Sequence, residues 1–385
     1  MRNNLVPIRI FILFASLAGC GTRNTPADPG TEILAGSETR TPFLPASETP
    51  SIQFLTATPT LTASPTETPS PTATSTGTPT PSMQVNLQAV GDIMMARTIG
   101  DLVLTEGPGA IFAGVQSVLD TADVLVGNLE CAITGRGEPQ PKIYTFAAPP
   151  AAAQALGLAD FDVLSLANNH AMDFGSVGLL DTRYNLEQYG IASVGAGANT
   201  IEAHAPVILE RNGLRMAFLA YVDVPNEFTG FDTHTWIATD TQPGVAWAYR
   251  DQIKADVTAA RLLADVVVVF LHSGYEMNDM VVAHQRGEAI TAIDAGAALV
   301  IGSHPHILQG VEKYHGGLIA YSLGNFVFDD NEGISNASVI LQVLLTRQGV
   351  ENYHFVPVLI ENGLPRLAAA WEAPAIGTMV SPINP

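Results

Sequence analysis

Short apolar runs and longer amphipathic stretches alternate along the chain from residue 83 onward. The apolar runs, rich in β-branched residues, predict strands over 85–90, 123–127, 162–167, 216–222, 266–271 and 298–301. The stretches between them have helical periodicity, which predicts helices over 110–120, 150–158, 176–190, 248–264 and 280–296. Continuous apolar strands are typical of sheets that are buried on both faces. Their alternation with helices therefore predicts a layered α/β fold.

The pattern changes after residue 318, where strands and turns follow one another without helices. Turns are expected at Gly349 and Gly363, and strands over 319–321, 338–345 and 353–360. We therefore expect one folded domain over residues 83–361 and a C-terminal tail over 362–385.

The first twenty residues have the pattern of a secretion signal. A basic start with Arg2 and Arg9 precedes an apolar run over 10–15, which is too short to cross a bilayer as a helix. The run is followed by Leu-Ala-Gly before Cys20, an ending that resembles the lipobox of bacterial lipoproteins. The resemblance implies a signal peptide over 1–19, a lipid on Cys20 and a location on the extracytoplasmic face of the cell membrane. An ordinary signal peptide with an incidental cysteine is the alternative.

Residues 20–82 form a tract that is rich in threonine, proline and serine. The tract contains few large apolar side chains and has no helical or strand period, so it cannot bury enough surface to offset the entropy of the chain. Frequent proline favours an extended conformation. We expect a disordered spacer between a membrane anchor and the folded domain.

The charge of the chain limits its partners. Its 385 residues carry 17 Lys and Arg against 37 Asp and Glu, which gives a net charge of −20. Nucleic acid is excluded as a partner at that charge, because phosphate binding requires a basic surface. An anionic polymer could be approached only through a local basic or metal-bearing site. With Cys20 lipidated, Cys131 has no cysteine left to pair with, and we expect it to be a buried, inert thiol.

Polar residues that can bind metal or move protons follow five of the predicted strands. They are Asp92, Asn128 with Glu130, Asn169 with His170, His272, and His304 with His306. In α/β folds the carboxyl ends of the strands line one crevice, where ligands bind. Any one of these residues alone could be a capping or turn residue, since Asp and Asn are common at such positions. Five in series favour a shared site.

The segment His304-Pro305-His306 is the sharpest local signal. Proline prevents a regular helix across the pair and favours an extended backbone before it. Residues two apart in an extended segment point to the same side, so both imidazoles could meet one metal ion or a close metal pair. A mixed set of Asp, Glu, Asn and His ligands favours a divalent ion such as Mn, Zn or Fe. A structural turn with two surface histidines is the alternative.

His170 has the place of a proton donor rather than that of a metal ligand. It follows Asn169 directly, so if the Asn side chain is a ligand, the imidazole projects differently and stands beside the metal. A histidine at that position could protonate a leaving group. Asp173 could orient His170 through its second ring nitrogen, or it could be the N-cap of the following helix.

The chain also contains six motifs in a distinctive order. They are Ala89-Val-Gly-Asp-Ile-Met94, Gly127-Asn-Leu-Glu130, Leu166-Ala-Asn-Asn-His-Ala-Met-Asp-Phe-Gly175, His272-Ser-Gly-Tyr-Glu276, Gly302-Ser-His-Pro-His306 and Tyr321-Ser-Leu-Gly-Asn-Phe-Val-Phe-Asp329. The series resembles the CapA/PgsA family of capsule-synthesis proteins, which are linked to the production and export of poly-γ-glutamate. The family in turn resembles calcineurin-like metallophosphoesterases. The resemblance covers residues 85–330 and implies a four-layer α/β/β/α sandwich.

Carried over motif by motif, the resemblance implies a metal site and a proton donor. His170 matches the proton donor. One firm metal site would be served by Asp92, Asn169, His272 and one of His304 and His306. The metallophosphoesterase pattern has a histidine where Met94 stands and an aspartate where Asn128 stands, so a second metal site should be weak or absent. Glu130 could compensate as a further ligand.

Three more residues are expected beside these ligands. Asn128 is the amide at the second motif, Asn325 could hydrogen-bond a catalytic loop, and Glu276 could accept a hydrogen bond or lie at a polar rim. An insertion over 226–247 carries two tryptophans and could form a lid or a rim that contacts polymer.

Two functions of different classes follow from the resemblance. The first is a metal-dependent hydrolase or transferase that acts on an anionic capsule polymer or a phosphorylated substrate at the cell surface. The second is a non-catalytic subunit that binds and guides the polymer, together with the membrane proteins of capsule synthesis and export. His170 and the intact Asp92 favour an enzyme, whereas Met94 and Asn128 favour a reduced or altered activity.

Overall fold

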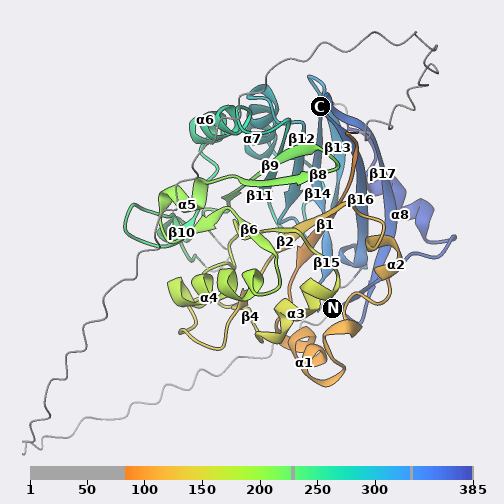
Figure 1. The fold of residues 1–385 in the computed structure, drawn as a ribbon. Helices are drawn as coiled ribbons and strands as arrows, with labels where there is room; N and C mark the ends of the chain where they lie inside the picture. Colours follow the sequence, from red (N-terminus) through yellow and green to blue (C-terminus); the bar gives the residue numbers. More distant parts are fainter. Residues whose placement is uncertain (1–82, 227–229, 330–332, 384–385) are drawn as a thin grey trace, which may run out of the picture. The chain divides into compact units, whose positions relative to one another are not determined.

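Two β-sheets that pack face to face form the centre of the fold. The computed structural model describes residues 83–226, 230–329 and 333–383 (Figure 1). The predicted signal peptide, Cys20 and the predicted spacer lie outside the described residues. Within the described ranges, no helix combines the length and the hydropathy that a membrane span requires.

The first sheet has the strand order β18-β17-β16-β1-β2-β5-β6, with β15 paired to the end of β1. Its strands are β1 (Val85–Ile93), β2 (Val124–Leu129), β5 (Val163–Ser165), β6 (Ala192–Val194), β15 (Asn325–Val327), β16 (Ala337–Thr346), β17 (Gly349–Glu361) and β18 (Leu364–Leu367). β1, β2, β5 and β6 run parallel, and β16 runs antiparallel to β1. The parallel strands therefore bring their carboxyl ends to one edge of the sheet.

The second sheet has the order β13-β14-β12-β11-β9-β8. Its strands are β8 (Val207–Arg211), β9 (Leu214–Asp223), β11 (Val266–Ser273), β12 (Leu299–Ser303), β13 (Leu308–Tyr314) and β14 (Gly317–Leu323). β9, β11, β12 and β14 run parallel, so this sheet also has one edge of carboxyl ends. Two short pairs lie outside both sheets, β3 (Ala132–Ile133) with β4 (Ala147–Ala148) and β7 (Ala196–Gly197) with β10 (Gly244–Val245).

Helices flank the sheets. They are α1 (Arg97–Thr105), α2 (Gln116–Leu119), α3 (Ala151–Leu158), α4 (Gly175–Glu187), α5 (Thr200–His204), α6 (Arg250–Ala260), α7 (Ala283–Asp294) and α8 (Ala373–Met379), with 3-10 helices at Pro108–Ala110, Thr233–Trp236 and Gly333–Asn336. Four predicted helices are confirmed within a few residues, as α3, α4, α6 and α7. The helix predicted over 110–120 is confirmed only at α2, because a turn that contains Gly114 occupies residues 111–115.

The alternation of side chains along β9 shows how the layers are joined. Phe218, Ala220 and Val222 point into the core between the two sheets. Ala217 and Leu219, on the opposite face of the same strand, pack with residues of α6 and α7 in a second core. A strand with apolar side chains on both faces needs a cover on both, which is why its sequence reads as a continuous apolar run.

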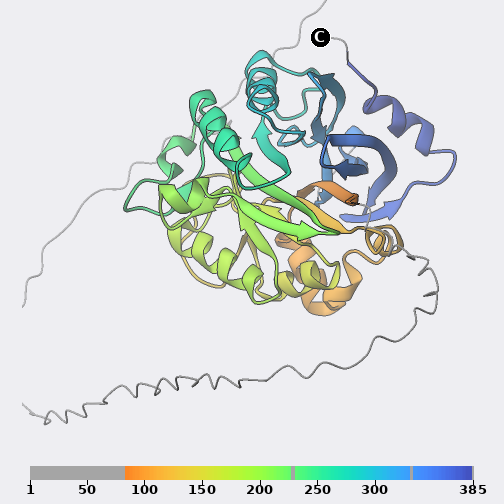
Figure 2. The same cartoon turned by 45° about the horizontal axis from the view of Figure 1, so that its top comes forward.

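The predicted four-layer α/β/β/α arrangement is confirmed. Helices α6 and α7 cover the outer face of the second sheet, and α3 and α4 lie on the other side of the fold, beside the first sheet (Figures 1 and 2). The structure continues past residue 361, where a separate tail was expected. β18 pairs with β17, and α8 packs near the same strand, because apolar residues such as Ile376 are buried there.

Two glycines allow close approaches that position the strand ends. A Cβ atom at Gly91 would lie 1.9 Å from the carbonyl oxygen of Gly324, and one at Gly302 would lie 1.9 Å from that of Tyr321. Gly91 immediately precedes Asp92, so the missing side chain lets β1 approach the residues before β15.

Candidate metal centre

The polar residues predicted at strand ends come together where the two sheets meet. Asp92 and Asn128 are register partners on β1 and β2 of the first sheet. His272 and Ser303 are register partners on β11 and β12 of the second sheet. Nδ2 of Asn128 lies 3.3 Å from Nδ1 of His272, so the two sets of carboxyl ends form one cluster.

The carboxylate of Glu130 lies within this cluster without a hydrogen-bond partner among the described residues. Its side chain is 0% exposed, and neither oxygen has a hydrogen-bond partner among the described residues. Oε1 lies 3.8 Å from Nε2 of His272 and 3.7 Å from Nε2 of His306. Because a buried carboxylate without a hydrogen bond is costly in free energy, these oxygens are suited to receive a cation.

Two overlapping sets of side chains could hold a metal ion, with ligand atoms that all lie within 4.8 Å of one another. The sets are Asp92, Glu130 and His272, and Glu130, His304 and His306. Nδ1 of His304 is also buried without a hydrogen-bond partner in the described part of the chain. Carboxylate and imidazole donors fit Mn, Zn or Fe, so the residues present fit a divalent metal, with Glu130 shared by both sets.

Three asparagine side chains arrange the cluster. Nδ2 of Asn128 donates to Oδ1 of Asp92 at 2.8 Å, and Oδ1 of Asn169 lies 2.8 Å from Nε2 of His272. Asn168, which the sequence analysis did not single out, donates to Oδ1 of Asn128 at 3.2 Å. Its position before Asn169 at the end of a strand is the signal that could have identified it.

Burial sets the protonation of the cluster. It raises the pKa of Glu130 well above its ordinary value, and the nearby Asp92 carboxylate raises it further. Burial lowers the pKa of His272 and of His304 well below that of a free imidazole, and neighbouring imidazoles add to the effect. Burial also disfavours charge on His306, but the carboxylates of Glu130 and Asp92 outweigh it and raise the His306 pKa to about 10. Only a neutral imidazole can ligate a metal, so His272 and His304 have the ligating form near neutral pH, whereas His306 would have to release its proton when a metal binds.

His304 and His306 converge through a turn, and the predicted extended conformation is wrong. The φ angle is 95° at His304 and 57° at His306, in a region that non-glycine residues rarely adopt. The turn is held by two hydrogen bonds from backbone N–H groups. That of His304 donates to Oδ2 of Asp92 at 3.2 Å, and that of Met277 donates to the Pro305 carbonyl at 2.9 Å. The ring centroids of the two histidines lie 5.9 Å apart, so both still reach the cluster.

Asp173 orients His170 and does not cap helix α4. Its Oδ2 lies 2.7 Å from Nδ1 of His170 and accepts the backbone N–H of Phe146 at 2.7 Å. The N-cap position of α4 is occupied by Phe174, which makes no side-chain hydrogen bond there. The geometry therefore favours the first of the two alternatives for Asp173.

Lys142 joins this pair, although no motif of the sequence points to it. Its ammonium donates to Oδ1 of Asp173 at 2.6 Å, and both side chains are fully buried. Lysine is seldom buried, and a single lysine in a loop carries no periodic signal. The contact becomes visible only through the tertiary structure.

Of the two remaining predicted residues, Asn325 lies in the cluster and Glu276 lies outside it. Asn325 lies on β15 as the register partner of Asp92, and its Oδ1 lies 2.9 Å from Nδ1 of His306, so it orients a candidate ligand. Glu276 is exposed and lines the mouth of a neighbouring cavity of about 730 Å³. Glu276 is thus a rim residue rather than part of the buried cluster.

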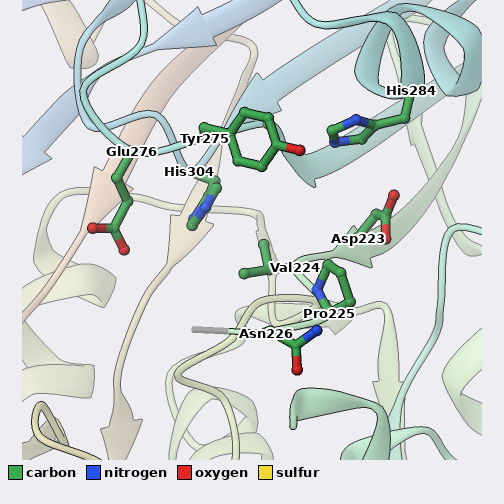
Figure 3. A pocket seen from close by; sticks show the side chains of 9 residues that line it. Asp223, Val224, Pro225, Asn226, Tyr275, Glu276, His284 and His304 are labelled. Atoms are coloured by element: carbon green, nitrogen blue, oxygen red, sulfur yellow. The ribbon is translucent and has the colours of Figure 1, made fainter. Parts of the chain in front are cut away.

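The cavity borders the cluster at His304. His304 forms one of its walls, and Tyr275, His284 and Asp223 lie around the rest of it (Figure 3). Among the described residues that line it, none is a lysine or an arginine. An anionic substrate in this cavity would therefore depend on a cation in the cluster for attraction.

The tryptophans of the insertion over 226–247 do not form an exposed rim. Trp236 and Trp247 are both 4% exposed, and the Trp247 ring stacks on His234 with centroids 4.4 Å apart. Because both side chains are buried, neither ring is available to contact polymer at the surface.

Cys131 is buried next to the cluster, as predicted. Its Sγ accepts the backbone N–H of Met95 at 3.4 Å, and burial raises the pKa of the thiol to about 12. A thiol with that pKa stays protonated near neutral pH and is a poor nucleophile and a poor metal ligand.

Comparisons with known proteins agree with the motifs. Residues 86–330 match the family described as Bacterial capsule synthesis protein PGA_cap, which confirms the resemblance seen in the sequence. The chain is 33% identical to the PGA biosynthesis protein CapA of Bacillus subtilis, over 72% of this chain and 72% of that protein. It is also 33% identical to the capsule biosynthesis protein CapA of Bacillus anthracis, over 74% of this chain and 69% of that protein.

Two solved structures are more distantly similar. A novel phosphatase from Mycoplasma pneumoniae has a TM-score of 0.45 and 10% identity, over 72% of this chain and 94% of that chain. A 5'-nucleotidase from Candida albicans has a TM-score of 0.42 and 9% identity, over 76% of this chain and 56% of that chain.

Proposed function

The chain belongs to the bacterial capsule synthesis protein family, and on that premise we propose that it is a metal-dependent hydrolase or transferase of capsule synthesis. Its substrate would be an anionic capsule polymer or a phosphorylated precursor. The relatives of known role are named for the biosynthesis of PGA and of capsule, which supports a polymer of that kind. The partners would be the membrane proteins that synthesise and export the polymer.

The buried Glu130 carboxylate is the observation that carries the proposal. It lies without a hydrogen-bond partner between His272 and His306, and Asp92 and His304 complete the two overlapping ligand sets. A protein that required only a stable fold would gain from an apolar residue at this position, since burying a carboxylate without hydrogen bonds costs free energy. A cation-binding role accounts for that cost.

The residues of the chain have separate tasks in this proposal. Asp92, Glu130, Asn169, His272, His304 and His306 would hold a divalent ion. When bound, such an ion polarises a phosphoryl or carbonyl oxygen and lowers the pKa of a water molecule. His170, held by Asp173, would deliver a proton to the leaving group. Asn325 would keep the His306 ring in place through its contact with Nδ1.

We also propose that the protein is held on the outer face of the cell membrane by a lipid on Cys20. The sequence before Cys20 supports this, because small residues precede the cysteine at the places that a lipobox requires. A long spacer would let the catalytic body reach polymer as it leaves the membrane. Replacement of Cys20 by serine should release the protein into the medium, and unchanged membrane association would rule out lipidation as the anchor.

A non-catalytic role in binding and guiding polymer is the second candidate. It is favoured by one observation, the neutral amide of Asn128 that donates to Asp92. The amide removes a carboxylate from the cluster and with it the support for a second metal ion. It is disfavoured by the cavity, whose described lining residues offer no lysine or arginine to an anionic polymer.

The experiment that decides between them measures hydrolysis of phosphodiester and γ-glutamyl substrates by the metal-loaded chain. His170→Ala should lower turnover by roughly 100-fold or more if His170 is the general acid. A wild-type chain that binds metal but turns over neither class of substrate would support the non-catalytic role. If His170→Ala leaves turnover untouched, another group supplies the proton.

A further inference from the structure

We propose that Lys142 is a positioning residue for His170, acting through Asp173, and that Trp236 of the 226–247 insertion holds the Lys142 ammonium in place. This inference rests on the proposed function, because His170 is the group that would deliver the proton. It assigns a role to Lys142, which no sequence motif identifies. It also assigns one to the 226–247 insertion, which contributes none of the candidate metal ligands.

The first observation is the burial of Lys142. Its side chain and that of Asp173 are both 0% exposed. Taking an ammonium out of water is unfavourable, and the free energy is recovered only when partners with good geometry replace the lost hydration. Nothing in the packing of the sheets requires a lysine here, because Lys142 lies in the loop between β3 and β4.

The second observation is the set of groups around the ammonium. Nζ donates to Oδ1 of Asp173 at 2.6 Å and to the main-chain carbonyl of Asn169. It also lies 4.7 Å from the centroid of the Trp236 ring and 5.8 Å from that of Phe231. A carboxylate, a carbonyl and an aromatic face together replace water around a cation.

These contacts determine how His170 is held. Lys142 binds Oδ1 of Asp173, while Oδ2 meets Nδ1 of His170 and the N–H of Phe146. The ammonium fixes the position of the Asp173 carboxyl group, whose Oδ2 accepts from Nδ1 of the imidazole, so Nε2 is the nitrogen left for proton transfer. The ammonium also donates to the main-chain carbonyl of Asn169. It therefore fixes Asn169, a candidate ligand, directly, and His170, the proton donor, through Asp173.

The insertion supplies the other side of this arrangement. Trp236 ends the 3-10 helix Thr233–Trp236 and is buried, and its ring lies 5.1 Å from that of Phe231 by centroids. The two rings cover the ion pair of Lys142 and Asp173. By excluding water they strengthen the pair, which is how an insertion distant from the ligands would influence the proton donor.

The test uses the full chain with 15N-labelled histidine and the variants Lys142→Met, Trp236→Phe and Trp236→Leu. Lys142→Met keeps the length of the side chain and removes its charge. Lys254→Met is the matched control, because Lys254 is an exposed lysine on α6. The His170 signal is assigned by its loss in His170→Gln. The wild type, Lys254→Met and Trp236→Phe should show the Nδ1–H tautomer with a slowly exchanging Nδ1 proton.

In Lys142→Met the slowly exchanging proton should be lost, and in Trp236→Leu its exchange should be faster. If the chain is active, Lys142→Met should lower kcat by about 10- to 100-fold with KM within about 2-fold, and it should cause no further loss in a His170→Ala background. A merely structural lysine would lower the residual rate of His170→Ala as well.

A folded Lys142→Met variant with an unchanged His170 signal would overturn the proposal, whatever the activity. Should Lys142→Met fail to fold, the exchange of the His170 Nδ1 proton in Trp236→Leu tests the proposal, since this variant keeps both Lys142 and Asp173. An exchange rate equal to that of the wild type would then overturn it. Absence of turnover in the wild type would contradict the proposed function, but the tautomer of His170 would still decide the role of Lys142.

Discussion

Asn128 donates its side-chain amide to Oδ1 of Asp92 at 2.8 Å, so these register partners of neighbouring strands are joined by a neutral hydrogen bond. A carboxylate at residue 128 would instead face the carboxylate of Asp92, with Glu130 close by. Like charges so close in a dry interior repel strongly unless a cation lies between them.

Asn128→Asp should therefore have opposite effects without and with metal. In the presence of a chelator the melting temperature should fall, because one more carboxylate is buried unpaired. With Mn or Zn the bound metal should rise from about one towards two ions per chain. Calorimetric titration and thermal melts measure both. A variant that binds no more metal than the wild type would show that Asn128 does not limit the second site.

Glu130→Gln should stabilise the metal-free protein and weaken metal binding. Burial and the nearby Asp92 raise the Glu130 pKa, so near neutral pH the carboxyl group makes the folded, metal-free chain less stable than a neutral glutamine would. The free energy of unfolding in chelator should therefore rise by about 1 kcal/mol or more. The same change removes a ligand shared by both sets, and metal affinity should fall at least about 10-fold. Glu106→Gln, at an exposed position on the helix C-cap, is the control. Equal metal affinity in Glu130→Gln and wild type would remove Glu130 from the ligand set.

The sequence predicted the layers and the meeting of the strand ends because both depend on local patterns. The apolar runs that became β1, β9 and β11 are long and rich in β-branched residues, and Asp92 and His272 occur at their ends. Parallel strands then bring such residues to one edge without any further information.

Other features depend on contacts that no local pattern encodes. The backbone at His304 and His306 was expected to be extended, because proline favours that conformation in the residue before it. In the structure the segment is a turn, held by hydrogen bonds with Asp92 and Met277 that lie far away in the sequence. Lys142 reaches Asp173 from a loop with no periodicity. Helix α1 was missed because nine residues interrupted by a glycine are too short for a clear helical period.

Glu288 should make stability depend on pH. Burial and, after it, the neighbouring Asp223 carboxylate raise its pKa to about 9, while Ser273 and Arg250 oppose the shift. The folded chain therefore holds a proton that the unfolded chain, with the ordinary value of 4.5, releases. The stabilisation is present in full below pH 4.5 and is lost as the pH rises to about 9.

Glu288→Gln keeps the shape of the side chain and removes its titration. Its free energy of unfolding should fall less steeply between these pH values than that of the wild type, as measured by denaturant unfolding at several pH values. Glu351→Gln, an exposed residue, should leave the slope unchanged. Parallel curves for Glu288→Gln and wild type would show that Glu288 titrates normally in the folded state.

Gly91→Ala should disturb both the fold and the site. The added Cβ would lie 1.9 Å from the Gly324 carbonyl oxygen, which belongs to the backbone and cannot move alone. We expect a loss of roughly 3 kcal/mol in stability and a weaker metal affinity, because Asp92 follows directly. Gly135→Ala, where an added Cβ would meet no atom within 4 Å, is the matched control. Two variants of equal stability would contradict the close approach of β1 to Gly324.

Metal content is the most direct measure of the central claim, that the strand ends of the two sheets form a site for a divalent ion. Elemental analysis of the chain purified without added metal, followed by titration with Mn and Zn after chelation, should give about one tightly bound ion per chain. His304→Ala should lose most of that affinity. A wild-type chain that binds none of these ions, or a His304→Ala variant that binds them equally well, would contradict the account.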